Sequence, residues 1–337
     1  MLLLADDPEF AEHDPGPGHP ERVARLRAVE AGVAAARIDD ALVPLEPRDA
    51  TRADLERVHS VTMLDTLEEL CANGGGHLDA DTVASSGSWP AALRAAGAGL
   101  AAIEALERGE GDAAFLGVRP PGHHATGRVP MGFCLLNNVA VAAAALSERG
   151  ERVCIVDYDA HHGNGTQDIF FSNPNVCYVS LHEWPLYPGT GRLQDTGQGA
   201  GIGTTCNFPF PAGATGDVYL RAFDEVVTPL VDGFGPAWVL VSAGFDAHRA
   251  DPLTGLELSA GDYAALAARV RALAPRPGRL VVFLEGGYDL AALRDGVAAT
   301  LRTLVGEPAD PVEAPTAGGP GRTVVEAARD LWAERLL

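Results

Sequence analysis

Residues 153–165 read Val153-Cys-Ile-Val-Asp-Tyr-Asp-Ala-His-His-Gly-Asn-Gly165, an apolar run joined directly to a group of polar side chains. The first four residues are apolar and mostly β-branched, which predicts a buried strand over residues 153–156. Asp157, Asp159 and His161 follow at alternate positions. On an extended chain this spacing places all three side chains on one side. The segment therefore predicts a buried strand with chemically active groups at its carboxyl end.

Other apolar runs of the chain have the same organisation. Strands are predicted over residues 113–117, 176–181, 238–241 and 280–284, and helices over 90–108, 138–149, 219–231, 259–273 and 290–305. The polar groups after these strands are Arg119-Pro-Pro-Gly-His123-His124, Ser180-Leu-His182, Ser242-Ala-Gly-Phe-Asp246 and Glu285-Gly-Gly-Tyr288. Apolar strands separated by helices indicate a parallel sheet covered on both faces. Ligands bind at the carboxyl edge of such sheets, so we expect an active site there.

Composition narrows the class of protein. The chain has 337 residues, and 46 acidic residues against 25 basic ones, all arginine, give a net charge of −21. This balance argues against nucleic-acid binding, and it favours a cationic partner or simply solubility. We expect a single domain over residues 1–337. It ends in a Pro/Gly-rich surface segment and a terminal helix at about residues 307–337, with the helix over 323–336.

Nothing in the sequence reads as an export or membrane signal. The first ten residues lack a basic region and a cleavage site, and no apolar run approaches the ~20 residues that span a bilayer. The five cysteines form no C-x-x-C pair. We therefore expect a cytoplasmic protein with buried free thiols and no membrane segment.

Two strand ends together offer a set of metal ligands. Asp159 and His161 follow one strand, and Asp246 follows another. One imidazole and two carboxylates leave a coordination position open for water, as in a catalytic rather than a structural zinc site. Either aspartate alone would be explained as a loop cap. That explanation does not account for acids at two strand ends together with a histidine.

Groups suited to acid–base chemistry lie at the same predicted edge. His123 and His124 follow a rigid Pro-Pro-Gly turn, and two adjacent imidazoles beside a metal site favour function over structure. Tyr288 can donate its hydroxyl to an oxyanion, or it packs at a loop. The sequence contains no G-x-S-x-G elbow and no phosphate-binding loop, and residues 197–203 read as a glycine-rich loop.

With these residues assembled, the chain closely resembles the zinc-dependent histone deacetylase superfamily, including bacterial class II-like deacetylases and acetylpolyamine amidohydrolases. The resemblance runs from about His19-Pro-Glu-Arg to Tyr288 and beyond. Its motifs are Arg119-Pro-Pro-Gly-His-His124, Gly132-Phe-Cys134, Asp157-Tyr-Asp-Ala-His-His-Gly-Asn-Gly165, Tyr187-Pro-Gly-Thr-Gly191, Ser242-Ala-Gly-Phe-Asp246 and Glu285-Gly-Gly-Tyr288. It implies the arginase-like α/β fold, in which helices flank both faces of a central parallel sheet of about eight strands.

The resemblance also implies a role for each matching residue. The implied ligands of one Zn²⁺ are Asp159, His161 and Asp246. His124 matches the general base that later acts as general acid, and His123 matches its electrostatic companion. Tyr288 matches the oxyanion donor. Asp157 matches the partner of His123, and Asn164 the partner of His124. Class I members carry Asp at that last position, and neutral Asn orients the ring while favouring imidazolium less strongly.

The implied substrate site and a second cation site complete the set. Residues matching the narrow acyl-lysine tunnel and its rim are Gly132, Phe133, Tyr187, Leu253 and Asp81, where Tyr187 replaces a frequent Phe. Residues matching a monovalent-cation site, which K⁺ would fill, are Asp157, Asp159, His161, Ser180 and Leu181.

The expected activity is removal of acetyl or other acyl groups from lysine side chains or related amines, with release of acetate. An acetylpolyamine or another small acylamine is the alternative substrate. Leu253 stands where one polyamine-selective branch has an acid, which favours a peptide or protein, but the net charge of −21 would attract a polyamine equally well. A non-catalytic binding protein on the same fold is a remote alternative, because the ligands, histidine pair and tyrosine are all intact.

Overall fold

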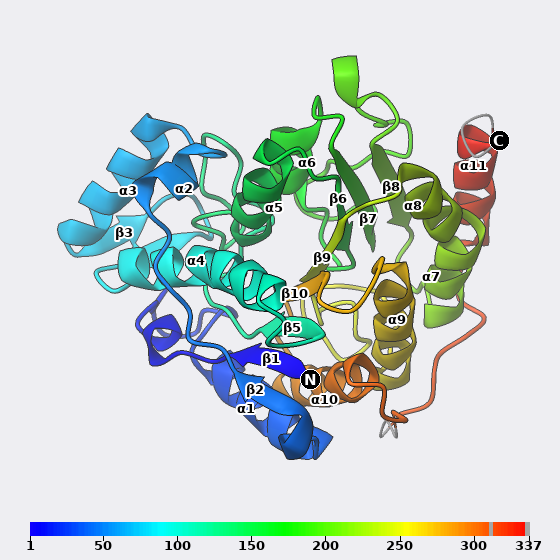
Figure 1. The fold of residues 1–337 in the computed structure, drawn as a ribbon, viewed down its shortest axis with the longest axis horizontal. Helices are drawn as coiled ribbons and strands as arrows, with labels where there is room; N and C mark the ends of the chain where they lie inside the picture. The colour runs from blue at the N-terminus through cyan, green and yellow to red at the C-terminus, as the bar shows by residue number, and fades with distance from the viewer. Residues whose placement is uncertain (310–312, 334–337) are drawn as a thin grey trace.

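The computed structural model describes residues 1–309 and 313–333, and these residues form an α/β fold around a central sheet (Figure 1). The sheet has eight strands in the order β2-β1-β5-β10-β9-β6-β7-β8, all parallel. Its strands are β1 (Leu2–Ala5), β2 (Leu42–Pro44), β5 (Ala113–Leu116), β6 (Val153–Asp157), β7 (Val176–Glu183), β8 (Thr205–Phe210), β9 (Trp238–Ala243) and β10 (Leu280–Leu284). The predicted fold class is confirmed.

Helices cover both faces of the sheet because successive strand residues point to opposite sides. Phe115 packs into the core that contains α1, α9 and α10, whereas its neighbours Ala114 and Leu116 pack into the core that contains α3, α4 and α5. The helices are α1 (Ala24–Ala36), α2 (Arg52–Glu56), α3 (Val61–Ala72), α4 (Ser88–Glu107), α5 (Asn138–Glu148), α6 (Asn164–Phe170), α7 (Gly216–Ala222), α8 (Thr228–Phe234), α9 (Ala260–Leu273), α10 (Leu290–Leu304) and α11 (Arg322–Trp332). A small antiparallel pair, β3 (Gly75–His77) and β4 (Val83–Ser85), stands apart from the sheet.

All five predicted strands are present with ends within two residues of the prediction, but β1, β2 and β8 were not predicted. The strand β2 has only three residues, too few for a pattern to appear, whereas β1 has four, as many as the predicted β5, and was missed although its residues are apolar. The edge strand β8 reads Thr-Cys-Asn-Phe-Pro-Phe, and its polar Asn207 and its Pro209 interrupt the apolar run. Proline is tolerated there because an edge strand has one unpaired side.

The single helix predicted over residues 219–231 is wrong in detail. The chain instead forms α7, a π-helical turn over Phe223–Val227, and α8, which together run from Gly216 to Phe234. Pro229 lies at the start of α8 and has no N–H to donate to the preceding turn. A wider π turn next to it accommodates the missing hydrogen bond.

The C-terminal part folds back onto the domain. Thr316 donates to the Asp262 carboxylate, and α11 packs toward the β8 edge through buried Val325, Ala328 and Trp332. Residues 310–312 of the predicted Pro/Gly-rich segment and 334–336 of the predicted helix lie outside the described residues. All five cysteines are free and buried, as expected. Across the described ranges, every helix falls short of the length and apolarity needed to cross a bilayer.

Candidate active site

The predicted metal ligands meet at the carboxyl edge of the sheet. Asp159 and His161 follow β6, and Asp246 follows the adjacent strand β9. Their potential ligand atoms all lie within 4.8 Å of one another. Nδ1 of His161 is 3.2 Å from Oδ1 of Asp159 and 3.0 Å from Oδ2 of Asp246. The fold therefore brings the three residues into one buried cluster.

Two glycines make room for this cluster. A Cβ atom on Gly244 would lie 2.2 Å from Oδ2 of Asp159, and one on Gly286 would lie 2.2 Å from Oδ2 of Asp246. The N–H of Gly286 donates to Oδ2 of Asp159 at 2.8 Å. Any side chain at either glycine would displace a carboxylate, so the glycines of both motifs shape the site.

The electrostatics of the cluster fit a divalent cation. Burial opposes charge on His161, but hydrogen bonds and charges from Asp159 and Asp246 raise its pKa to about 10. Burial and the charge of Asp159 raise the pKa of Asp246 to about 7. Two carboxylates thus converge on one imidazole nitrogen, which can carry only one proton. A cation between them would satisfy both, and this N/O donor set is one that zinc accepts in catalytic sites.

The first histidine of the tandem pair is held by a carboxylate. His123 is buried, and its Nδ1–H donates to Oδ2 of Asp157 at 3.0 Å. The same oxygen accepts the hydroxyl of Tyr178 at 3.0 Å. Burial disfavours the charged imidazole, but the carboxylates of Asp159, Asp157 and Glu285 raise the pKa of His123 well above its usual value. This imidazole is therefore poised to carry positive charge.

The second histidine has a neutral partner. Nδ1–H of His124 donates to Oδ1 of Asn164 at 2.8 Å. Burial and the neighbouring charges of His123 and His161 lower the pKa of His124 well below its usual value. Its ring lies against Gly132, where a Cβ would come within 2.5 Å of Cδ2. His124 is thus held as a neutral imidazole, the form that a general base requires.

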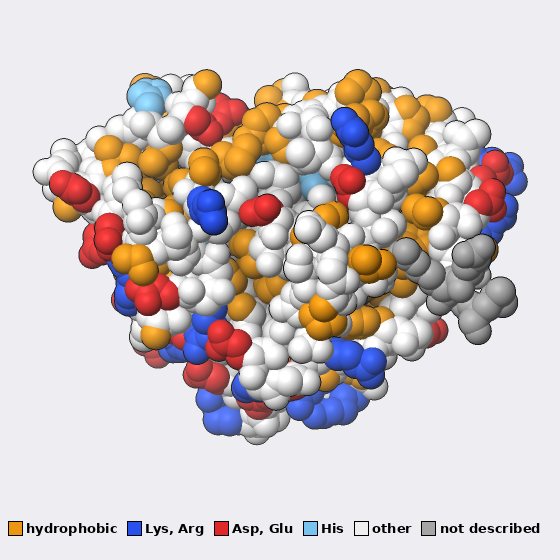
Figure 2. Space-filling model, turned by 90° about the horizontal axis from the view of Figure 1, so that it is seen from above, with side chains coloured by type: hydrophobic (Ala, Val, Ile, Leu, Met, Phe, Trp, Pro, Cys, Tyr) orange, Lys and Arg blue, Asp and Glu red, His pale blue; other side chains and the backbone are white. Residues whose placement is uncertain are grey.

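Aromatic side chains surround the approach to His124. The rings of Tyr187 and His124 are 5.2 Å apart, those of Phe133 and Tyr288 are 5.8 Å apart, and His19 packs edge-on against Phe133 at 4.6 Å. Figure 2 shows histidine atoms recessed near the middle of one face, bordered by hydrophobic side chains. The predicted tunnel residues Gly132, Phe133 and Tyr187 therefore lie together beside the histidine pair. His19 joins them, although the sequence analysis gave it no role in the site.

Tyr288 is positioned by two residues, Asp251 and Arg25, to which the sequence analysis gave no role. Its N–H donates to Oδ2 of Asp251 at 2.7 Å. The guanidinium of Arg25 in α1 lies 5.1 Å from the centre of the Tyr288 ring and donates to the carbonyls of Gly287 and Glu285. Arg25 is 262 residues from Gly287, so no local pattern could have found the contact.

Glu285 holds the turn before the histidines. Its Oε2 accepts the N–H groups of Gly122 and His123 at 2.7 and 3.2 Å, and its Oε1 accepts the hydroxyl of Ser242 at 2.9 Å. Burial raises the pKa of Glu285 to about 7. In the sequence analysis, Glu285 appeared only as the first residue of its motif and had no assigned role. Its carboxylate joins the end of β10 to Ser242 of β9 and to the turn that follows β5.

The remaining predicted residues belong to the substrate rim and to the monovalent-cation group. Asp81 is exposed, and its backbone carbonyl lies 2.9 Å from Nε2 of His19. Partial shielding of its carboxyl from water, a hydrogen bond with Asp79 and the charge of Asp79 raise its pKa. Leu253 is exposed on the loop that carries Asp251. In the predicted monovalent-cation group, Ser180 pairs in register with Asp157, and Leu181 follows it on β7.

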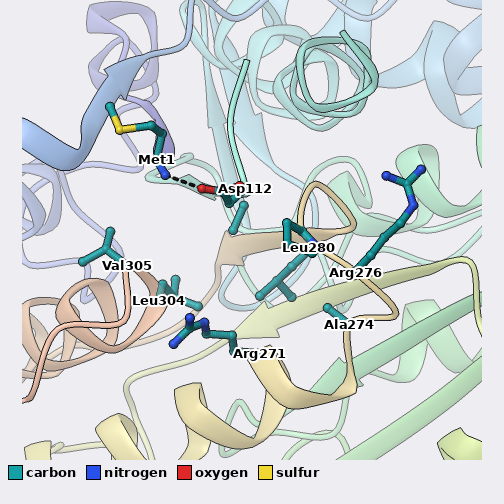
Figure 3. A pocket seen from close by; sticks show the side chains of 10 residues that line it. Met1, Asp112, Arg271, Ala274, Arg276, Leu280, Leu304 and Val305 are labelled. Atoms are coloured by element: carbon teal, nitrogen blue, oxygen red, sulfur yellow. Dashed lines mark hydrogen bonds and ion pairs between the residues drawn. The ribbon is translucent and has the colours of Figure 1, made fainter. Parts of the chain in front are cut away.

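A second cavity lies at the opposite, amino edge of the sheet. It measures about 410 Å³, and Met1, Asp112 and Leu280 line it at the starts of three strands. Figure 3 shows that the side chains of Arg271 and Arg276 point in different directions from its wall. The two guanidinium groups are separated, and the N-terminal ammonium of Met1 pairs with Asp112 in the same lining.

The parallel α/β sheet, the recessed histidine pair and the N/O donor cluster fit the deacetylase and amidohydrolase class of hydrolases. Residues 19–304 match the family model described as the histone deacetylase domain, and the chain belongs to that family.

Individual relatives agree with this assignment. The chain is 41% identical over 290 residues to a probable deacetylase of Archaeoglobus fulgidus, covering 84% of this chain and 80% of that protein. It is 40% identical over 247 residues to a histone deacetylase-like amidohydrolase of Pseudomonas aeruginosa, covering 72% and 65%. The crystal structure of the HDA15 HD domain is similar with a TM-score of 0.90 and 35% identity, covering 99% of this chain and 94% of that one.

Proposed function

We propose that this protein is a zinc-dependent deacetylase that hydrolyses acyl-lysine side chains. The observation that carries the proposal is the environment of His124, a neutral imidazole whose ring lies 6.0 Å from that of the cluster residue His161. Asp159, His161 and Asp246 would hold the metal. When bound, Zn²⁺ supplies a Lewis acid for an amide carbonyl and lowers the pKa of water.

The chain's own groups then divide the proton transfers between them. With Nδ1–H bound to Asn164, the Nε2 atom of His124 is free to accept a proton from the attacking water. The imidazolium returns that proton to the leaving amine nitrogen as the C–N bond breaks, which leaves acetate and a free amine. The hydroxyl of Tyr288 donates to the oxygen that gains negative charge. The raised pKa of His123 places a positive charge nearby.

One feature of the rim favours an acyl-lysine peptide as substrate, and another favours an acetylated polyamine. Leu253 is exposed and apolar on its loop, which favours a peptide lying across the rim. Asp79 and Asp81 lie close enough for their carboxylates to interact, and such a pair would attract the distal ammonium of an acetylated polyamine. The acyl-lysine peptide is our first candidate and the polyamine the second. The monovalent-cation site near Ser180 stays a prediction that K⁺ titration can test.

One experiment tests the proposal. Hydrolysis rates are measured on acetyl-lysine peptides, longer acyl-lysine peptides and acetylated polyamines, each with and without a zinc chelator. We expect turnover of the acetyl peptide that is lost on chelation and restored by Zn²⁺. Turnover that survives full metal removal would refute the metal dependence. Preference for the polyamine would promote the second candidate, and no turnover of any acyl amine by the zinc-loaded protein would favour a binding protein.

A further inference from the structure

A tight turn places the sulfur of Met131 beside the partner of His124. Met131 and Cys134 exchange two backbone hydrogen bonds of 3.0 Å, and the central residues Gly132 and Phe133 have φ angles of 56° and 66°. Positive φ at both positions is the geometry of a type I′ turn. From this turn the thioether accepts a hydrogen bond from Nδ2 of Asn164, with the nitrogen 3.4 Å from the sulfur.

The contact matters because the amide of Asn164 has two chemically different ends. Its Oδ1 accepts a hydrogen bond from Nδ1–H of His124, which keeps the hydrogen on Nδ1 and leaves Nε2 without one. If the amide were reversed, an N–H group would face Nδ1. That nitrogen would then have to accept, and the single imidazole hydrogen would move to Nε2. The two amide orientations therefore select opposite tautomers of the imidazole.

A thioether can distinguish these orientations. Sulfur in methionine is a weak acceptor and has no hydrogen to donate. It receives the N–H end of Asn164 and faces only lone pairs when the oxygen end is turned toward it. A carboxylate at position 164 would present the same oxygen on both sides and would need no such selection.

We propose that Met131 is a positioning residue whose thioether sets the amide orientation of Asn164 and, through it, the reactive tautomer of His124. The catalytic consequence rests on the proposed deacetylase function, but the structural consequence does not. Met131 touches no reacting atom, and its effect passes entirely through the asparagine. Replacing the asparagine by an aspartate should therefore abolish the dependence on Met131.

The test combines Met131→Leu with Asn164→Asp in a double-mutant cycle on the zinc-loaded protein. In the Asn164 background, Met131→Leu should lower kcat roughly three- to fivefold, the scale of a weak hydrogen bond, with KM unchanged. In the Asn164→Asp background the same substitution should leave kcat unchanged. Met63→Leu is the matched control, because it removes the thioether of another buried methionine, in α3, whereas the amide of Asn164 donates to Met131.

A second readout needs no turnover. Imidazole ¹⁵N shifts of His124, assigned by their loss in His124→Ala, report which nitrogen carries the hydrogen in the metal-free protein. The native chain should show the Nδ1–H form, and Met131→Leu should add a population of the Nε2–H form. If the protein hydrolyses no acyl amine, the proposed function fails while this measurement still decides the role of Met131.

Two results would overturn the proposal. One is an unchanged ¹⁵N spectrum and kcat in Met131→Leu. The other is an equal loss of kcat in both backgrounds, which would mean that the substitution acts by loosening the Gly132–Phe133 turn. Thermal melting of each variant accompanies the kinetics, so that a loss of folding is seen as a lower Tm.

Discussion

Two adjacent histidines of this protein have opposite electrostatic roles. The rings of His123 and His124 are 4.0 Å apart and both are buried. One donates to the carboxylate of Asp157 and has a raised pKa, while the other donates to the amide of Asn164 and has a lowered pKa. Burial acts equally on both rings. The surrounding charges therefore determine the difference, because the carboxylates of Asp159, Asp157 and Glu285 favour the charged form of His123, whereas the charges of His123 and His161 oppose it at His124.

Removing His124, the neutral histidine of the pair, should have the most severe consequence for catalysis. We expect His124→Gln to lower kcat by about 10³-fold, because general acid–base catalysis contributes on that scale. The protein should still bind zinc, since His124 is not among the clustered ligands. Metal analysis and steady-state rates check this. The exposed His77→Gln serves as control, and a His124→Gln enzyme of near-native rate would assign the base elsewhere.

Next in size is the loss of the oxyanion donor that serves the same reaction. Tyr288→Phe should lower turnover at least ~100-fold, the scale of losing one such donor. Zinc content should be unchanged, because the tyrosine lies outside the donor cluster. The measurement is kcat with metal content on the same sample. Near-normal turnover would remove Tyr288 from the mechanism.

Replacing Asn164, the partner of His124, by aspartate would give both histidines a carboxylate partner. In Asn164→Asp, a carboxylate would stabilise the imidazolium and raise the pKa of His124. A general base acts only in its unprotonated form, at pH values above its pKa. A raised pKa should therefore shift the acid limb of the kcat/KM profile to higher pH. The limb should move by roughly one pH unit, so the rate should fall roughly tenfold at pH values on the acid limb and change little at pH 7. An unmoved acid limb in the pH–rate profile would show that the limb belongs to another group.

A buried ion pair next to the histidine turn should have the least effect on the difference in protonation between His123 and His124. Arg119 precedes their turn and donates to both oxygens of buried Glu21. Burial opposes the charge, but Arg119 and His13 hold the pKa of Glu21 well below its usual value. Because the pKa of Glu21 is lower in the folded protein than in the unfolded chain, its charge stabilises the fold fully at pH values above its pKa in the unfolded chain. This stabilisation is lost as the pH falls toward the pKa of Glu21 in the folded protein.

Glu21→Gln should therefore destabilise the protein at pH 7 by about 3 kcal/mol, because it leaves Arg119 buried without its counter-ion. It should also flatten the loss of stability between pH 5 and 3. Urea unfolding at several pH values measures both. The shape of the pH–rate profile should not change, and a shifted profile would mean that this ion pair also tunes the histidines.

Much of the fold and the site followed from local patterns. Buried parallel strands appear as apolar β-branched runs, and the polar groups after them had to meet at one edge because parallel strands end together. Asp159, His161 and Asp246 could be grouped for that reason. The short strand β2 was missed because three residues carry too little pattern. Glu21 could not be identified as buried, since an isolated acid in a polar segment reads as exposed.

Residue types and their order along the chain establish which groups stand at the strand ends and the chemistry that those groups can perform. How each group is held follows from contacts that form on folding. Arg25 reaches Gly287 across 262 residues, Glu285 ties the histidine turn to Ser242, and Met131 orients Asn164. Residue type and spacing specify what a side chain can donate or accept. Which partner it meets depends on loop closures between distant segments, and these contacts set the protonation of His123 and His124.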